Sequence, residues 1–84
     1  MSPILETILE TYYEETFMIA DGFDDAIIGV DDSVPRLVYS TDKCLQILVD
    51  VEGMDYMDAI EHFEYNVKGS YMGEKTPLFI DDNF

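Results

Sequence analysis

The chain has 84 residues and carries 19 acidic side chains against four basic ones, which gives a net charge of −15 at neutral pH. Hydrophobic residues make up 48% of it and aromatic residues 13%, which excludes a disordered acidic tail, because such tails are poor in aromatic residues. The charge also argues against anionic membranes and direct nucleic-acid binding, since phosphate contacts need lysine and arginine. We expect a single folded domain over residues 1–84.

Residues 1–20 are predicted to form an N-terminal helix. Ser2 is a suitable N-cap and Pro3 a suitable first helical residue. Apolar side chains recur at helical spacing on one face, namely Ile4, Leu5, Ile8, Leu9 and Tyr12. Glu6, Glu10 and Glu14 are spaced four residues apart on another face, where each like-charge pair costs about 0.2–0.5 kcal/mol. This stripe has no stability rationale and is therefore a candidate binding surface.

Residues 21–80 are expected to form the α+β core of the domain. The sequence of residues 26–30 is typical of a short buried strand, and residues 36–39 are predicted to form a second one. Turn-forming residues separate the two, which favours an antiparallel hairpin. A third strand is predicted at residues 78–80 and can join either edge, and residues 81–84 form an acidic tail.

Two helices are predicted between the second and third strands. The first runs from about residue 42 to 52, with Ser40 or Thr41 as its cap and Gly53 as a left-handed stop. The second starts at Asp55 and closes at residues 68–69. The expected inner faces are Cys44, Ile47, Leu48 and Val51 in the first helix and Ala59, Ile60, Phe63 and Val67 in the second.

The predicted order of elements is therefore α-β-β-α-α-β. One sheet of three strands has to bury a face under helices. We expect an α+β fold, a small two-layer sandwich with a mostly antiparallel sheet.

Three groups of residues are candidates for chemical sites. His62 follows Asp58 by one helical turn, but it is the only histidine, and the spacing of a metal motif is absent. The segment 21–25 and the pairs at 31–32 and 81–82 are acidic, yet they lack the spacing of a calcium loop. Cys44 is the only cysteine, so no internal disulfide forms, and it is expected to be a core residue in a reducing, intracellular setting. We expect no enzyme activity, no catalytic residue, no metal and no cofactor.

Several stretches between residue 23 and about residue 80 are distinctive, namely residues 23–29, 38–39, 44 with 47–48, 53–54, 59–66 and 73–79, of which 61–66 and 73–79 are the most specific. In these stretches the chain resembles a family of small acidic proteins encoded by tailed bacteriophages. The resemblance implies a viral origin and a fold. Together with the reducing setting inferred from Cys44, it leads us to expect a location in the host cytoplasm. It carries over no catalytic residue.

The leading functional hypothesis is a phage-encoded acidic binding protein that inhibits or redirects a host protein with a basic surface by presenting a negatively charged, DNA-mimic-like surface to it. Candidate partners are nucleic-acid-handling or defence proteins. The alternatives are a small structural or assembly protein that acts through an aromatic surface, which allows a homodimer, and a small metal-dependent enzyme. The predicted partner-binding residues are Glu6, Glu10, Glu14, Glu61, Glu64, Tyr65 and Glu74.

Overall fold

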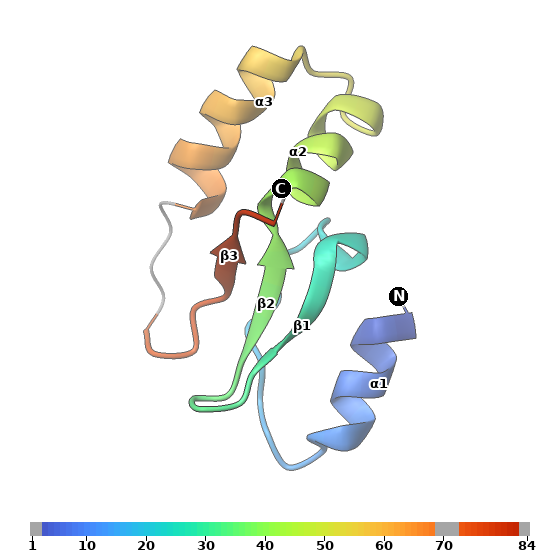
Figure 1. The fold of residues 1–84 in the computed structure, drawn as a ribbon, viewed down its shortest axis with the longest axis vertical. Coiled ribbons are helices and arrows are strands. Elements are labelled where there is room, and N and C mark those ends of the chain that lie inside the picture. The colour runs from blue at the N-terminus through green and yellow to red at the C-terminus, as the bar shows by residue number, and fades with distance from the viewer. Residues whose placement is uncertain (1–2, 69–72, 83–84) are drawn as a thin grey trace.

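The computed structural model describes residues 3–68 and 73–82, which form an α+β fold (Figure 1). The elements follow the predicted order α-β-β-α-α-β, so the fold class is confirmed. They are α1 (Pro3–Thr11), β1 (Ile27–Asp31), β2 (Arg36–Ser40), α2 (Thr41–Asp50), α3 (Tyr56–His62) and β3 (Leu78–Ile80). A 3-10 turn, η1 (Asp24–Ala26), precedes β1, and a π-helical turn, η2 (Phe63–Lys68), continues α3.

The three strands lie in the order β1-β2-β3 and form a mixed sheet. β1 and β2 pair antiparallel, as the hairpin pattern predicts, with an irregularity between Ile27 and Gly29. β3 joins the β2 edge and runs parallel to β2, with Val38 opposite Leu78. The prediction of a mostly antiparallel sheet is therefore wrong for β3. Because α2 and α3 lie between β2 and β3, the chain has the helical crossover that a parallel pair requires.

Helix α1 ends at Thr11 instead of near residue 20. The hydroxyl of Thr11 donates to the carbonyl oxygen of Thr7 at 2.8 Å, and a turn follows. Beyond it the chain is tied to the sheet, because the backbone N–H of Ala20 donates to the phenolic oxygen of Tyr39 at 2.8 Å. The prediction of a helix over residues 1–20 is therefore wrong, and Glu14 lies outside α1. The predicted N-cap Ser2 and the predicted stop Gly69 fall outside the described residues.

The start of α2 confirms the predicted cap. The hydroxyl oxygen of Ser40 accepts a hydrogen bond from the backbone N–H of Lys43 at 3.2 Å and donates its own proton to a carboxylate oxygen of Asp82 at 2.6 Å. This second bond fixes the end of the chain after β3 against the β2–α2 junction. Gly53 has a φ of +73°, so it supplies the left-handed residue that the sequence predicts after α2.

The core joins one face of the sheet to the helices. Its members are Leu5, Ile8, Phe23, Ala26, Ile27, Leu37, Tyr39, Cys44, Leu45, Leu48, Ala59 and Phe63. Phe79 packs against it and contacts two core rings, with centroids 5.3 Å from that of Tyr39 and 5.3 Å from that of Phe63. The predicted inner faces are largely confirmed, but Leu45 is buried instead of Val51, which is 73% exposed. The sheet thereby holds α3 and η2 in place through Phe63.

Two buried groups make the fold sensitive to alkali. Burial raises the pKa of Tyr39 from 10.0 to about 12 and the pKa of the Cys44 thiol from 9.0 to about 12. The unfolded chain therefore releases these protons before the folded chain does, so stability is retained below about pH 9 and falls as the pH rises toward about 12. Denaturant unfolding at a series of pH values should show this loss. A Cys44→Ala variant should lose less stability over this range, and an unchanged loss would contradict the contribution of Cys44.

Candidate interaction site

Carboxylates are spread over the surface, and few of them have cationic partners. None of the 19 acidic side chains is buried. Within residues 3–68 and 73–82 there are two salt bridges, between Arg36 and Asp31 at 3.0 Å and between Lys75 and Glu15 at 3.0 Å. Hydrogen bonds from Ser33 and the guanidinium of Arg36 also hold the pKa of Asp31 below its ordinary value. These pairs use two of the four basic residues, so most of the negative charge is not neutralised by ion pairs in the described part.

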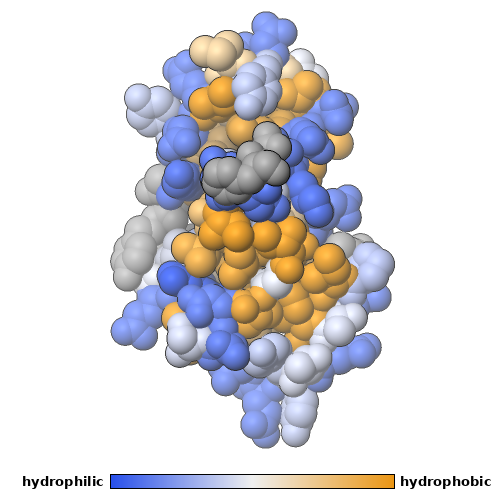
Figure 2. Space-filling view, viewed as in Figure 1, coloured by the Kyte–Doolittle hydropathy of each residue, from blue (hydrophilic) through white to orange (hydrophobic). Residues whose placement is uncertain are grey.

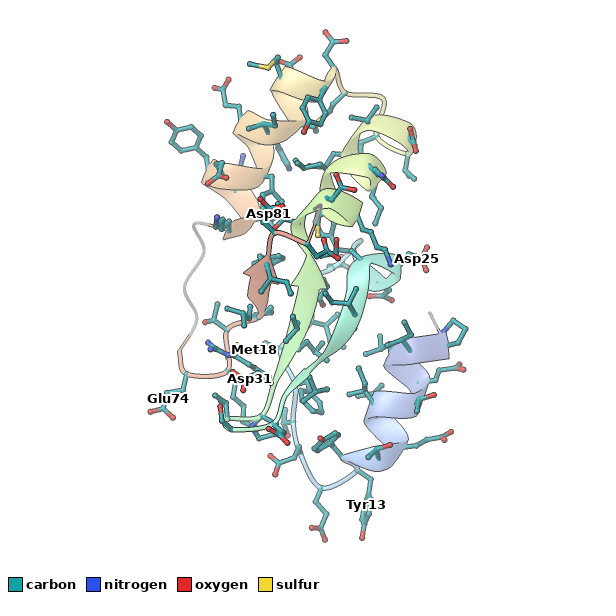
Figure 3. All side chains as sticks on the ribbon, in the orientation of Figure 1. Tyr13, Met18, Asp25, Asp31, Glu74 and Asp81 are labelled. Carbon is teal, nitrogen blue, oxygen red and sulfur yellow. The ribbon has the colours of Figure 1, made fainter. Side chains whose placement is uncertain are left out.

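The structure does not bring the seven predicted binding residues together. Glu6 and Glu10 are exposed on α1, and Glu14 is exposed in the turn after it. Glu61 is exposed on α3, whereas α1 and α3 lie toward opposite ends of the long axis (Figure 1). Glu74 stands apart on the turn before β3 (Figure 3). The predicted glutamate stripe is therefore not one helical face, because α1 ends too early.

Glu61, Glu64 and Tyr65, the remaining predicted residues, do share one helical segment, formed by α3 and η2. Beside them lies an open depression of about 590 Å³, lined by Met54, Asp58, Glu61, His62, Tyr65 and Asn66. Asp58, Glu61, His62 and Tyr65 are spaced i, i+3, i+4 and i+7, the spacing of one helical face. We refer to the exposed residues Asp58, Glu61, Glu64 and Tyr65 as the α3 acidic face.

Large apolar side chains are exposed next to these carboxylates. Tyr65 is 78% exposed, Met57 is 74% exposed and Tyr56 is 57% exposed. Neither of the two salt bridges in the described part involves α3 or η2. Tyrosine combines a large apolar ring with a polar tip and is enriched in protein interfaces for that reason. The α3 acidic face thus combines uncompensated charge with accessible aromatic area.

His62 is half-buried at the border between this depression and a second groove, which is lined partly by Phe23, Leu48 and Glu52. The side-chain nitrogen of Asn66 lies 3.4 Å from Nδ1 of His62, so the hydrogen-bond partner shown for the imidazole is Asn66. Among the residues that the structure describes, no three histidine, cysteine, aspartate or glutamate side chains gather as a metal-binding group. Cys44 lies in the core, as predicted.

Other aromatic residues lie elsewhere in the fold. Phe23 is buried in the core, and Phe17 packs edge-on against Tyr12 with ring centroids 6.0 Å apart. Lys75 lies 5.9 Å from the Phe17 ring centre, so it stabilises the segment after α1 as well as pairing with Glu15. Tyr71 lies outside the described residues. The exposed aromatic rings therefore do not all belong to one surface.

Sequence reasoning did not assign Met54, Asp58 or Asn66 to a binding site, although all three line the depression. The helical spacing of Asp58, Glu61 and Tyr65 was the signal that could have placed Asp58 there. Met54 precedes α3 and carries no such signal, because its place depends on how the chain turns between α2 and α3.

The comparisons with known proteins add no relative from which a function could be transferred. No protein-family model, curated protein or solved structure matches the chain. No helix in the described part of the chain is long and apolar enough to cross a membrane.

Proposed function

We propose that the protein is an acidic binding protein that engages a basic surface of another protein through its α3 acidic face. The observation that carries this proposal is the combination, on one helical segment, of carboxylates outside any ion pair in the described part with a tyrosine that is 78% exposed. Such a combination gives no advantage to the isolated chain, since like charges destabilise the compact state.

The two kinds of side chain have different roles in the proposed contact. The carboxylates of Asp58, Glu61 and Glu64 attract lysine and arginine side chains and speed the encounter with a basic partner. The ring of Tyr65 supplies apolar contact area and can receive a cationic head group on its face. The depression beside them offers room for one long basic side chain. No bond is made or broken in this function.

The chemistry of the partner follows from what the acidic face imitates. Asp58 and Glu61 are three residues apart, about 4.5 Å along the helix axis, and successive phosphates of one DNA strand are about 3.4 Å apart along the duplex. The two spacings are of the same order, so we infer that the face fits the lining of a basic groove, although it does not copy a whole duplex. This fit to a basic groove and the resemblance to bacteriophage proteins both support a partner that is a nucleic-acid-handling or defence protein in the host cytoplasm.

Capture of partners from a bacterial lysate tests this proposal. Immobilised protein should retain proteins with basic surfaces at low salt and release them at about 0.5 M NaCl, where charges are screened within a few ångströms. A parallel column carries the Asp58→Asn/Glu61→Gln/Glu64→Gln variant, which should retain less of the same proteins. The proposal fails if the retained proteins are no more basic than the lysate, or if high salt does not release them.

A further inference from the structure

One face of the sheet remains outside the core. Four apolar side chains of the strands belong neither to the core nor to the side chains packed against it, namely Ile28, Val38, Leu78 and Ile80. Ile80 is 37% exposed. The register places Val38 opposite Leu78, and side chains alternate along a strand, so Ile80 lies on the same face as both. Figure 2 shows an apolar patch across the middle of the molecule, where Figure 1 shows the sheet with no helix in front of it. We call Val38, Leu78 and Ile80 the open sheet face.

Acidic groups flank this patch at both ends of the strands. Asp81 and Asp82 follow β3, and Asp82 is held there by the hydroxyl of Ser40 at 2.6 Å. Asp31 ends β1 opposite Arg36, and Asp32 comes next in the turn. Figure 3 shows Asp81 and Asp31 toward the two ends of the sheet and Asp25 beside it. Arg36 pairs with Asp31, so the balance of charge around the patch is negative.

The dimensions of the face suit one helix. β1 and β2 each have five residues, which corresponds to about 17 Å of strand. That length matches about three turns of an α-helix, and three strands spaced about 4.8 Å apart match a helix diameter of about 10 Å. A helix with one apolar side would therefore cover the patch.

We propose that the open sheet face docks an amphipathic, cationic α-helix of the basic partner, with its apolar side on the sheet and its lysine or arginine residues near the flanking aspartates. This inference rests on the proposed function, because it takes the partner to be basic. A second copy of the chain is disfavoured as the occupant, since it would bring two chains of net charge −15 into contact.

The test uses a synthetic leucine–lysine peptide of about 14 residues with helical amphipathic spacing. Two control peptides have the same composition in an order without helical spacing, or glutamate in place of lysine. Affinity is measured for the wild type, for the more polar variant Val38→Thr/Ile80→Thr, and for Val51→Thr. Val51 is a matched control because it is an aliphatic side chain, 73% exposed, on a different element. Thermal unfolding of each variant confirms that it is folded.

We expect the amphipathic cationic peptide to bind, the Val38→Thr/Ile80→Thr variant to bind it about tenfold or more weakly, and Val51→Thr to be unchanged. Amide NMR shifts on peptide addition should centre on residues 28–30, 38 and 78–80. Failure of this peptide to bind, an unchanged affinity in the double variant, or shifts confined to α3 and η2 would each overturn the inference. So would self-association that strengthens with salt and is lost in the double variant, because the occupant would then be a second copy.

The outcomes separate this inference from the proposed function. If both lysine peptides bind with shifts confined to α3 and η2, the sheet-face proposal fails, while the proposed role of the α3 acidic face is retained. If the amphipathic peptide binds the sheet but the lysate column retains no basic proteins, the open face is a docking surface and the proposed function fails.

Discussion

Replacing Phe63 with alanine should remove about 3–5 kcal/mol from the free energy of unfolding, the usual cost of deleting a buried aromatic ring. The side chain is fully buried, and its ring meets that of Phe79 edge-on at 5.3 Å between centroids. A single small domain has only about 5–15 kcal/mol of stability in total. We therefore expect Phe63→Ala to lose a large fraction of this stability and to unfold at a clearly lower temperature and urea concentration than the wild type, as measured by circular dichroism.

Tyr65 provides the matched control for this prediction. It lies two residues after Phe63 in the same helical segment, but its side chain is 78% exposed. Tyr65→Ala should change the free energy of unfolding by no more than about 0.5 kcal/mol, the usual range for surface substitutions. If Tyr65→Ala were as unstable as Phe63→Ala, the Tyr65 ring would be needed for the fold. The exposure of Tyr65 would then not support a role in binding.

Two triple variants with equal charge changes should differ strongly in binding. Asp58→Asn/Glu61→Gln/Glu64→Gln removes three negative charges from the α3 acidic face. We expect it to weaken binding of a captured basic partner at least tenfold, equivalent to about 1.4 kcal/mol, when affinity is measured by titration calorimetry at about 0.1 M salt. The same variant should keep a stability close to that of the wild type, because relief of repulsion between like charges is offset by loss of the favourable charge of Asp58 in the first turn of α3.

The control removes the same charge elsewhere, in Glu6→Gln/Glu10→Gln/Glu14→Gln. These residues are exposed on and after α1, toward the other end of the molecule (Figure 1). We expect the affinity of this variant to stay within about twofold of the wild type. Exposed charges that lie farther from the bound partner than the Debye length, about 10 Å at 0.1 M salt, are largely screened. If both variants lose affinity equally, total charge governs binding. If the α1 variant loses more affinity, the binding residues are Glu6, Glu10 and Glu14, as the sequence predicted.

Local sequence patterns predicted most of the helices and strands, because the residues that begin and end each element lie within or next to it in the sequence. Ser40 caps α2 and Gly53 follows it with a positive φ, both as predicted from residue type alone. The strand at residues 78–80 and the burial of Ala59 and Phe63 also follow from short-range apolar spacing. These features depend on residues a few positions apart, which is the range over which sequence patterns are informative.

The features that escaped prediction depend on contacts between distant residues. Helix α1 ends at Thr11, and the segment after it is bound to the sheet by the hydrogen bond from the Ala20 N–H to Tyr39, which joins residues 19 positions apart. The direction of β3 depends on how α2 and α3 carry the chain back to the β2 edge. For the same reason the sequence grouped Glu6, Glu10 and Glu14 with Glu61 and Glu64, and the structure separates these two sets.

The dependence of partner affinity on salt tests the central claim most directly. The dissociation constant of one basic protein captured from the lysate should be measured for the wild-type chain over a series of NaCl concentrations from about 0.05 to 0.5 M, a range in which the Debye length falls severalfold. If the acidic surface carries the interaction, affinity should fall steeply and continuously over this range, and Tyr65→Ala should weaken it further at every concentration. An affinity that stays flat, or that rises with salt, would contradict the account.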